Sequence, residues 1–267
     1  GSIRVRENSA LRAWREGRQT VGCWLSLANA YSAEALARLG FDWVCLDLQH
    51  GLLDYSDLTH LLPAVSGSDA TPLVRVPWNE PYEIMKALDA GAYGVIVPMV
   101  NDREEAARAV SACRYPPDGN RSFGPIRGAL YGGRGYASEA NGQIACIAMI
   151  ETRRGLDNLE EIVTTPGLDA VYIGPSDLAL ALGLPATGDT DDPEHAAAVA
   201  SILEACRKAG IGAGIHTSSL EYTRRYLDAG FHFVTLGSDA GFMMRAAADD
   251  LAALRIGRPP EAEKTGY

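Results

Sequence analysis

The chain has 267 residues, of which 47% are hydrophobic and 22% are charged. These proportions are those of an ordinary globular protein, and they exclude a disordered chain, a collagen-like repeat and a coiled coil. Lys and Arg number 24 against 34 Asp and Glu, a net charge of −10, which argues against nucleic acid as the main partner because phosphate binding needs a basic surface. Every apolar run is shorter than the roughly 18 residues of a membrane span, so we expect no membrane partner.

The length suits a single α/β barrel, and we expect one domain over residues 3–256. We interpret residues 1–2 as the scar of a removed tag, and residues 257–267, rich in Pro, Gly and charge, as a flexible tail. The five cysteines are odd in number, widely spaced and without a CxxC pair, and most lie inside apolar runs. This pattern predicts that the cysteines are buried free thiols in a reducing cytoplasm.

Short apolar runs alternate with helical patterns along the chain. The runs predict strands at 20–27, 41–46, 72–76, 94–99, 144–150, 168–173, 211–215 and 231–236. Helices are expected at 32–39, 54–65, 81–89, 102–113, 155–164, 193–209, 219–229 and 240–255, with a long loop at 114–142. Eight such units in about 250 residues predict a (β/α)8 TIM barrel. An open doubly wound sheet is the alternative, but Asn29-Ala30-Tyr31 stands where its glycine-rich phosphate turn would follow the first strand.

Polar residues stand where six of the predicted strands end, and the carboxyl ends of barrel strands carry catalytic residues. They are Asp47 and His50 in DLQHG, Arg75, Glu151, the segment Gly174, Pro175, Ser176 and Asp177, then His216-Thr217, and Gly237-Ser238-Asp239. Structural alternatives exist for two of them. Arg75 could form only a buried ion pair with Asp47, and Asp177 could cap a short helix at 178–182. A carboxylate such as Glu151 directly after an apolar strand is harder to explain structurally, because its burial is costly without a partner.

Two of these carboxylates suggest a metal site. Glu151 and Asp177 supply hard oxygen ligands, which favour Mg²⁺, Mn²⁺ or a similar divalent ion such as Co²⁺ over a structural zinc. Such an ion could act as a Lewis acid on the keto group of a chelating 2-oxo acid. Main-chain N–H groups of 174–177 could hold the carboxylate of that acid, and Arg75 could stabilise the enolate oxygen. Asp47 could orient His50 as the base.

The chain resembles the HpcH/HpaI family of class II, metal-dependent pyruvate aldolases, close to the hydroxy-ketoacid (4-hydroxy-2-oxo acid) aldolases. The resemblance rests on DLQHG at 47–51, LVRV around Arg75, MKALDAGAYGVIVPMV at 85–100, YPPDGNRSFGP at 115–125, MIET at 149–152 and YIGPSDLALALG at 172–183. It implies Glu151 and Asp177 as metal ligands, Arg75 on the keto oxygen and His50 as base. It also implies a hexamer built as a trimer of dimers, whose last helix swaps between subunits and in which Asp89 reaches a neighbouring active site.

The chain departs from its relatives at the end of the seventh strand, where His216 stands in place of an apolar residue. This difference suggests that the enzyme accepts more polar aldehydes. Trp24 is expected to wall the same pocket, or else to be a core aromatic. The loop at 114–142 holds Arg114, Arg121, Arg127 and Arg134, and we interpret it as a lid that binds the polar end of the substrate, or as a subunit contact.

The expected reaction is the reversible aldol cleavage of a 4-hydroxy-2-oxo acid to pyruvate or hydroxypyruvate and an aldehyde. A Schiff-base mechanism is not expected, because the three lysines, Lys86, Lys208 and Lys264, all lie away from strand ends. A CoA-ester lyase of the malyl or citryl type is the alternative, and its phosphate site would have to come from the arginines of 114–142. A non-catalytic metabolite sensor is a third possibility, but it would leave the base and metal ligands idle.

Overall fold

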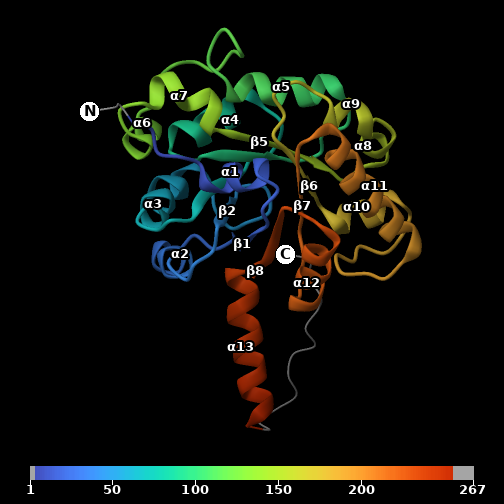
Figure 1. The fold of residues 1–267 in the computed structure, drawn as a ribbon. Coiled ribbons are helices and arrows are strands. Elements are labelled where there is room, and N and C mark those ends of the chain that lie inside the picture. Colours follow the sequence, from blue (N-terminus) through green and yellow to red (C-terminus); the bar gives the residue numbers. More distant parts are fainter. Residues whose placement is uncertain (1–3, 255–267) are drawn as a thin grey trace.

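The computed structural model describes residues 4–254, and these form a closed barrel of eight parallel strands in chain order (Figure 1). The strands are β1 Thr20–Leu25, β2 Trp43–Asp47, β3 Thr71–Arg75, β4 Gly94–Val97, β5 Ala145–Ile150, β6 Ala170–Ile173, β7 Gly212–Ile215 and β8 Phe233–Ser238. The pairing of β1 with β8 closes the barrel, with a register shift between Gly22 and Cys23. The predicted (β/α)8 barrel is therefore confirmed. The predicted tag scar and flexible tail fall on residues 1–2 and 257–267, outside the described residues.

Helices connect the strands, and most of them surround the barrel and cover its outer face (Figure 1). They are α1 Ser9–Arg15, α2 Ala30–Ala37, α3 Tyr55–Val65, α4 Pro81–Asp89, α5 Arg103–Cys113, α6 Arg127–Gly132, α7 Tyr136–Gln143, α8 Arg153–Asp157, α9 Leu159–Val163, α10 Pro175–Ala181, α11 Pro193–Ala209, α12 Leu220–Ala229 and α13 Asp239–Ala253. The bounds of α4 and α11 match the prediction. The helix predicted at 155–164 is instead two short helices, α8 and α9, which meet at Asn158.

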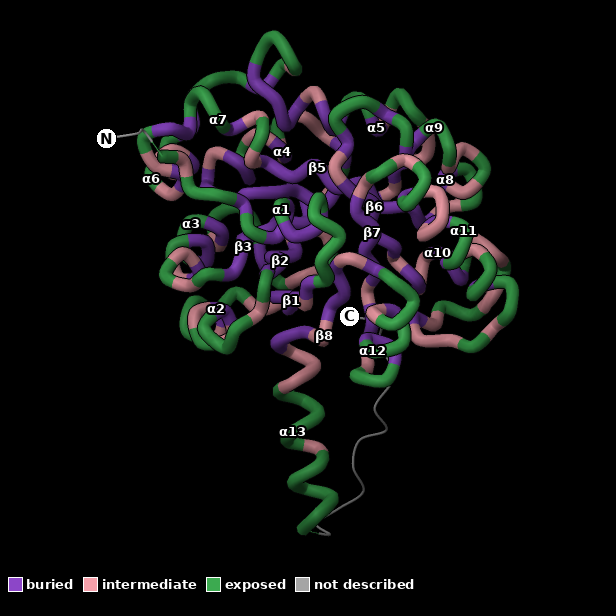
Figure 2. The backbone as a smooth tube through the Cα atoms, viewed as in Figure 1, coloured by how far each residue is buried: buried purple, intermediate pink, exposed green. Residues whose placement is uncertain are grey.

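Buried residues form two layers, one inside the barrel and one between strands and helices (Figure 2). Large aromatic side chains fill the interior, among them Trp24, Trp43, Tyr172 and Phe233. Gly22 makes room for this packing, because a Cβ there would lie 2.1 Å from the Trp43 ring. The five cysteines are free and buried, as the sequence predicted. Among residues 4–254, no helix has the length and apolar character needed to cross a membrane.

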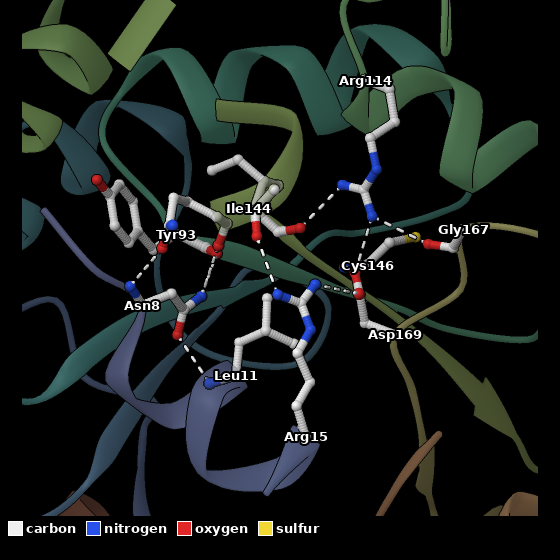
Figure 3. A network of polar contacts seen from close by, with 11 residues as sticks. Asn8, Leu11, Arg15, Tyr93, Arg114, Ile144, Cys146, Gly167 and Asp169 are labelled. Atoms are coloured by element: carbon white, nitrogen blue, oxygen red, sulfur yellow. Dashed lines mark hydrogen bonds and ion pairs between the residues drawn. The ribbon is translucent and has the colours of Figure 1, made fainter. Parts of the chain in front are cut away.

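The N-terminal helix α1 was not predicted from the sequence. Its Trp14 stacks on Phe233 of β8, with ring centroids 4.1 Å apart, so α1 closes the amino-terminal end of the barrel. Asn8 fixes the start of α1: its side chain accepts from the N–H of Leu11 and donates to the carbonyl of Tyr93 (Figure 3). This helix leaves the opposite, carboxyl end of the barrel as the open one.

The segment 114–142, predicted as one long loop, contains the helices α6 and α7. Two of its arginines are used inside the protein. Arg114 is buried and binds Asp169 at 2.8 Å as well as the carbonyls of Ile144 and Gly167 (Figure 3). Arg121 is also buried and donates to Asp89 at 2.8 Å. These arginines stabilise the barrel wall, so they are not available to bind a substrate.

The last helix, α13, extends away from the barrel (Figures 1 and 2). Asp239 anchors its start, because the carboxylate accepts from the main-chain N–H groups of Ser26 and Leu27 at 2.9 and 3.0 Å. Farther along, Met243 and Met244 are more than half exposed. A projecting helix with exposed apolar side chains needs a covering surface to be stable in water, as a helix swapped between subunits would have.

Candidate active site

An open cavity lies at the carboxyl ends of β3, β5, β6 and β7. Its lining combines residues predicted from the sequence with others that were not. The lining residues are Arg75, Met149, Glu151, Tyr172, Gly174, Pro175, Ser176, Asp177 and His216. Six of the candidate residues thus share this cavity with Asp177, and the seven come from the ends of β3, β5 and β7 and from the start of α10 after β6. No residue of the segment 114–142 lines it.

Arg75 and Asp47 form a buried ion pair at the ends of β3 and β2. Nε of Arg75 donates to Oδ1 of Asp47 at 2.8 Å, and Nη2 donates to Oδ2 at 2.5 Å. Desolvation opposes the charge on both groups, but the arginine holds the pKa of the Asp47 carboxyl below its usual value. The ion pair considered as a structural alternative is therefore present. Arg75 also lines the cavity, so it has both a structural partner and access to the site.

His50 lies in a tight turn that Asp47 stabilises through the main chain. Oδ1 of Asp47 accepts from the backbone N–H groups of Gln49 at 3.0 Å and His50 at 3.3 Å. Gly51 is required by the turn, because a Cβ there would lie 2.3 Å from the carbonyl oxygen of Asp47. The carboxylate thus positions His50 through its backbone, whereas the sequence predicted that it would orient the imidazole. His50 is exposed and lies outside the set of residues that line the cavity.

Glu151 is buried at the end of β5, and two backbone features fit around it. Its Oε1 accepts from the N–H of Met99 at 2.9 Å. Met99 has a φ of +55°, the left-handed conformation that non-glycine residues rarely adopt, and this aims its N–H at the carboxylate. On the other side, a Cβ at Gly174 would lie 2.2 Å from Oε2 of Glu151. The backbone therefore holds this carboxylate at one place.

Asp177 lies in the first turn of α10, whose N-cap is Gly174, so the structural alternative of Asp177 as a helix cap is wrong. Burial, and then the nearby Asp177 charge, raise the pKa of the Glu151 carboxyl to about 7. Two carboxylates this close and partly desolvated favour a cation between them. The pair fits a hard divalent ion that keeps open positions for water and substrate. Among residues 4–254, no group of three or more His, Cys, Asp or Glu forms a complete protein cage.

Besides Asp47 and His50, two further predicted site residues do not line the cavity in the single chain. Trp24 is fully buried beneath it, and its indole N–H donates to Oδ2 of Asp47 at 3.1 Å, as expected for the alternative of a core aromatic. Asp89 ends α4 and binds Arg121. Its expected role lies in a neighbouring subunit, and the cavity of its own chain does not include it.

Sequence reasoning missed Tyr172 and Thr235. Tyr172 lies on β6, lines the cavity and contacts His216, and Thr235 lies on β8 with no exposed surface. One signal for Tyr172 was available: in AVYI of β6 it shares the inward-facing alternation with Ala170. The role of Thr235 depends on the pairing of β8 with β7, which brings its hydroxyl beside His216.

His216 follows β7 and is held from the barrel interior. Its Nδ1 lies 3.1 Å from the Tyr172 hydroxyl and 3.2 Å from the Thr235 hydroxyl. Its ring stands edge-on to Trp24, with centroids 4.9 Å apart. Burial, and then the charge of Arg75, lower the pKa of His216 to about 4, so the imidazole is neutral near pH 7.

Residues 20–246 match the family model described as HpcH/HpaI aldolase/citrate lyase. The chain belongs to this family. The match covers the whole barrel from β1 into α13, so it includes every residue that lines the cavity. The aldolases of the family are lyases of class II, which generally depend on a divalent metal.

Relatives of known function support the same assignment. The hydroxypyruvate/pyruvate aldolase of Rhizorhabdus wittichii is 44% identical over 248 residues, covering 93% of this chain and 99% of that protein. The 4-hydroxy-2-oxo-heptane-1,7-dioate aldolase of Shigella sonnei is 38% identical over 263 residues, which cover 97% of this chain and 99% of that protein. A solved HpcH/HpaI family structure from Burkholderia cenocepacia superposes with a TM-score of 0.87 at 37% identity, and the match covers 93% of this chain and 99% of that chain. The CoA-ester lyases are distant neighbours by comparison.

Proposed function

We propose that the chain is a class II pyruvate aldolase, which cleaves 4-hydroxy-2-oxo acids reversibly to pyruvate or hydroxypyruvate and an aldehyde. The observation that carries the proposal is the meeting of Glu151, Asp177 and Arg75 in one cavity at the carboxyl ends of the strands. Two carboxylates can hold a divalent ion, and a buried guanidinium can neutralise an oxyanion beside it. The relatives named above act on substrates of this kind.

Each residue has a role in this proposal. Glu151 and Asp177 would hold Mg²⁺, Mn²⁺ or Co²⁺, and the ion, when bound, supplies Lewis-acid polarisation of the keto group. Gly174, Pro175 and Ser176, which line the cavity, would contact the carboxylate of the keto acid. Arg75 would donate to the keto oxygen and stabilise the negative charge that develops there as the enolate forms.

We assign the proton transfer at the substrate hydroxyl group to His50. In cleavage, a base removes the proton from the hydroxyl group at C4, and the same group returns a proton in condensation. The backbone hydrogen bond to Asp47 positions His50 in its turn, and Asp89 of a neighbouring subunit would act beside it. This last role requires an oligomer. We propose a cytoplasmic hexamer, a trimer of dimers in which α13 swaps between subunits and buries its exposed Met243 and Met244.

The alternative of a CoA-ester lyase has little support in the structure. The basic residues that would bind the CoA phosphates were expected in the segment 114–142, and Arg114 and Arg121 are there committed to Asp169 and Asp89. Arg127 donates to the carbonyl of Ala90 and to Ser66. A panel of 4-hydroxy-2-oxo acids and malyl- and citryl-type thioesters, assayed with several divalent ions, tests the choice. Turnover of the thioesters alone would overturn the proposed function.

A further inference from the structure

Three side chains from consecutive strands form a closed triangle beneath the cavity. The hydroxyls of Tyr172 on β6 and Thr235 on β8 lie 2.5 Å apart, and His216, after β7, brings its Nδ1 to 3.1 and 3.2 Å from them. Tyr172 and Thr235 have no exposed surface, so water does not replace these contacts. Within residues 4–254, the two hydroxyl groups have no other hydrogen-bond partners.

Counting protons decides the tautomer of His216. Two hydroxyl protons are available, because burial keeps the pKa of the Tyr172 phenol far above its usual value and the phenol stays protonated. If Nδ1 accepts, one hydroxyl donates to the other and the second donates to Nδ1, so both protons are used. If Nδ1 carried a proton, it would donate to one hydroxyl, and one hydroxyl proton would have no acceptor. A buried donor without an acceptor is costly, so Nδ1 accepts and the ring proton lies on Nε2.

Because Nδ1 of His216 is used by the two hydroxyls, Nε2 is the ring nitrogen that can interact with a ligand in the cavity. It lies on the opposite side of the ring from the Tyr172–Thr235 pair, and His216 is one of the residues that line the cavity. Among the described residues, Nε2 has no hydrogen-bond partner, and it is not one of the fully buried polar atoms without one. The lowered pKa of His216 agrees with a neutral ring that carries a single proton.

We propose that His216 is a fixed hydrogen-bond donor that selects aldehydes with an oxygen on the carbon next to the carbonyl, and that Tyr172 and Thr235 position it. This inference deepens the proposed aldolase function and rests on it. An aldehyde oxygen substituent can accept from Nε2–H, whereas an alkyl group displaces water and leaves the donor unpaired. A cationic substituent such as an ammonium group offers no acceptor and is disfavoured.

The tautomer can be measured without any activity assay. We would label the five histidines with ¹⁵N and record magic-angle-spinning NMR spectra of the sedimented, Mg²⁺-loaded protein. His232 is an internal reference for a ring protonated at Nε2, because its Nδ1 accepts from the backbone N–H of Ala213 at 3.1 Å. His216 should show the same pattern of one protonated and one unprotonated nitrogen, with the proton on Nε2. A ring protonated at Nδ1 would overturn the inference.

Variants test the positioning role of the two hydroxyls. In Thr235→Val, the Tyr172 hydroxyl still donates to Nδ1, so the tautomer should be kept. In the double variant Tyr172→Phe/Thr235→Val both donors are lost, so the ¹⁵N shift of the unprotonated Nδ1 of His216 should move towards that of a nitrogen that accepts no hydrogen bond, while the His232 signals are unchanged. An unaltered His216 signal in the double variant would contradict the positioning role.

The specificity is measured with two aldehydes of equal heavy-atom count, glycolaldehyde and propanal, added to pyruvate. The ratio of their kcat/KM values cancels differences in active fraction between proteins. We expect the ratio to favour glycolaldehyde and to fall on the order of tenfold in His216→Leu and in the double variant, but little in Thr235→Val. Equal ratios in all four proteins would overturn the specificity role while leaving the aldolase function standing. Absence of any turnover with an Nε2-protonated His216 would instead overturn the aldolase function, and with it the specificity role.

Discussion

The guanidinium of Arg75 binds the carboxylate of Asp47 through two parallel hydrogen bonds, 2.8 and 2.5 Å long, at the floor of the cavity. The same carboxylate accepts from the indole of Trp24 and from the backbone of His50. Asp47 therefore connects the group proposed to hold the keto oxygen with the turn that carries the proposed base. The negative charge of Asp47 stabilises both the Arg75 guanidinium and the turn that carries His50.

Asp47→Asn should destabilise the protein strongly. The substitution leaves the buried Arg75 without an anion, and breaking such a pair costs about 3–5 kcal/mol. The exposed Asp228 on α12 is a matched control, since Asp228→Asn changes the same charge at the surface. Thermal unfolding of both variants measures the difference. Equal midpoints would show that the ion pair contributes little to stability.

No lysine should form a Schiff base with pyruvate. Lys86 is exposed on α4, where its ammonium lies 4.1 Å from the ring centre of Tyr55, and Lys208 is exposed on α11 beside Glu204. Lys264 lies outside the described residues. Incubation with pyruvate and borohydride, followed by mass spectrometry, should therefore leave the mass of the protein unchanged. A stable adduct on a lysine, accompanied by loss of activity, would refute the class II mechanism.

His50→Ala should lower the rate of aldol cleavage by about 10²-fold or more, the usual effect of losing a general base. Pyruvate binding should largely survive, because Arg75, Glu151 and Asp177 remain. The control is His60→Ala, which removes an exposed imidazole from α3. Steady-state cleavage and a pyruvate titration separate the two effects. Cleavage by His50→Ala at the rate of the unaltered enzyme would leave the turn around His50 with a structural role only.

The preference between glycolaldehyde and propanal should stay constant from about pH 5.5 to pH 8. The pKa of His216 is lowered to about 4, so its ring remains neutral over this range. The unfolded chain, with a histidine pKa near 6.5, binds more protons than the folded protein between these two values. The contribution of His216 to the free energy of unfolding is therefore present above pH 6.5 and is lost as the pH falls towards 4. A preference that titrates with a midpoint near pH 6.5 would show an ordinary, solvated imidazole.

The barrel was predictable from two sequence patterns. Each buried parallel strand is a continuous apolar run, and in the helices the apolar residues recur at the spacing of an α-helix. Helix α1 was missed because its seven residues gain their stability from a distant contact, that of Trp14 with Phe233. The glycine-rich segment that contains α6 and α7 likewise carries little helical pattern of its own. Its arginines find partners far along the chain, such as Asp169 for Arg114.

The charged part of the site was predictable for a different reason. A carboxylate such as Glu151, placed after a fully apolar strand, is expected to be buried, and burying it without a partner would cost free energy, so a functional role is indicated. The hydroxyl pair Tyr172–Thr235 gave no comparable signal, since tyrosine and threonine are common in strands and these two are 63 positions apart. The partner of Asp47 was also ambiguous, because the sequence does not say whether its carboxylate meets an imidazole or a guanidinium.

The most direct test of the account is metal-dependent cleavage at the proposed carboxylate pair. The enzyme is stripped with a chelator, checked by elemental analysis, and titrated with Mg²⁺, Mn²⁺ or Co²⁺ while pyruvate release from a 4-hydroxy-2-oxo acid is followed. Glu151→Gln, Asp177→Asn and, as a control, Glu139→Gln on the exposed surface of α7 are measured alongside. We predict that the stripped enzyme is inactive, that a divalent ion restores it and the control, and that the two cavity variants are not restored. Full cleavage activity in a verified metal-free sample would contradict the account.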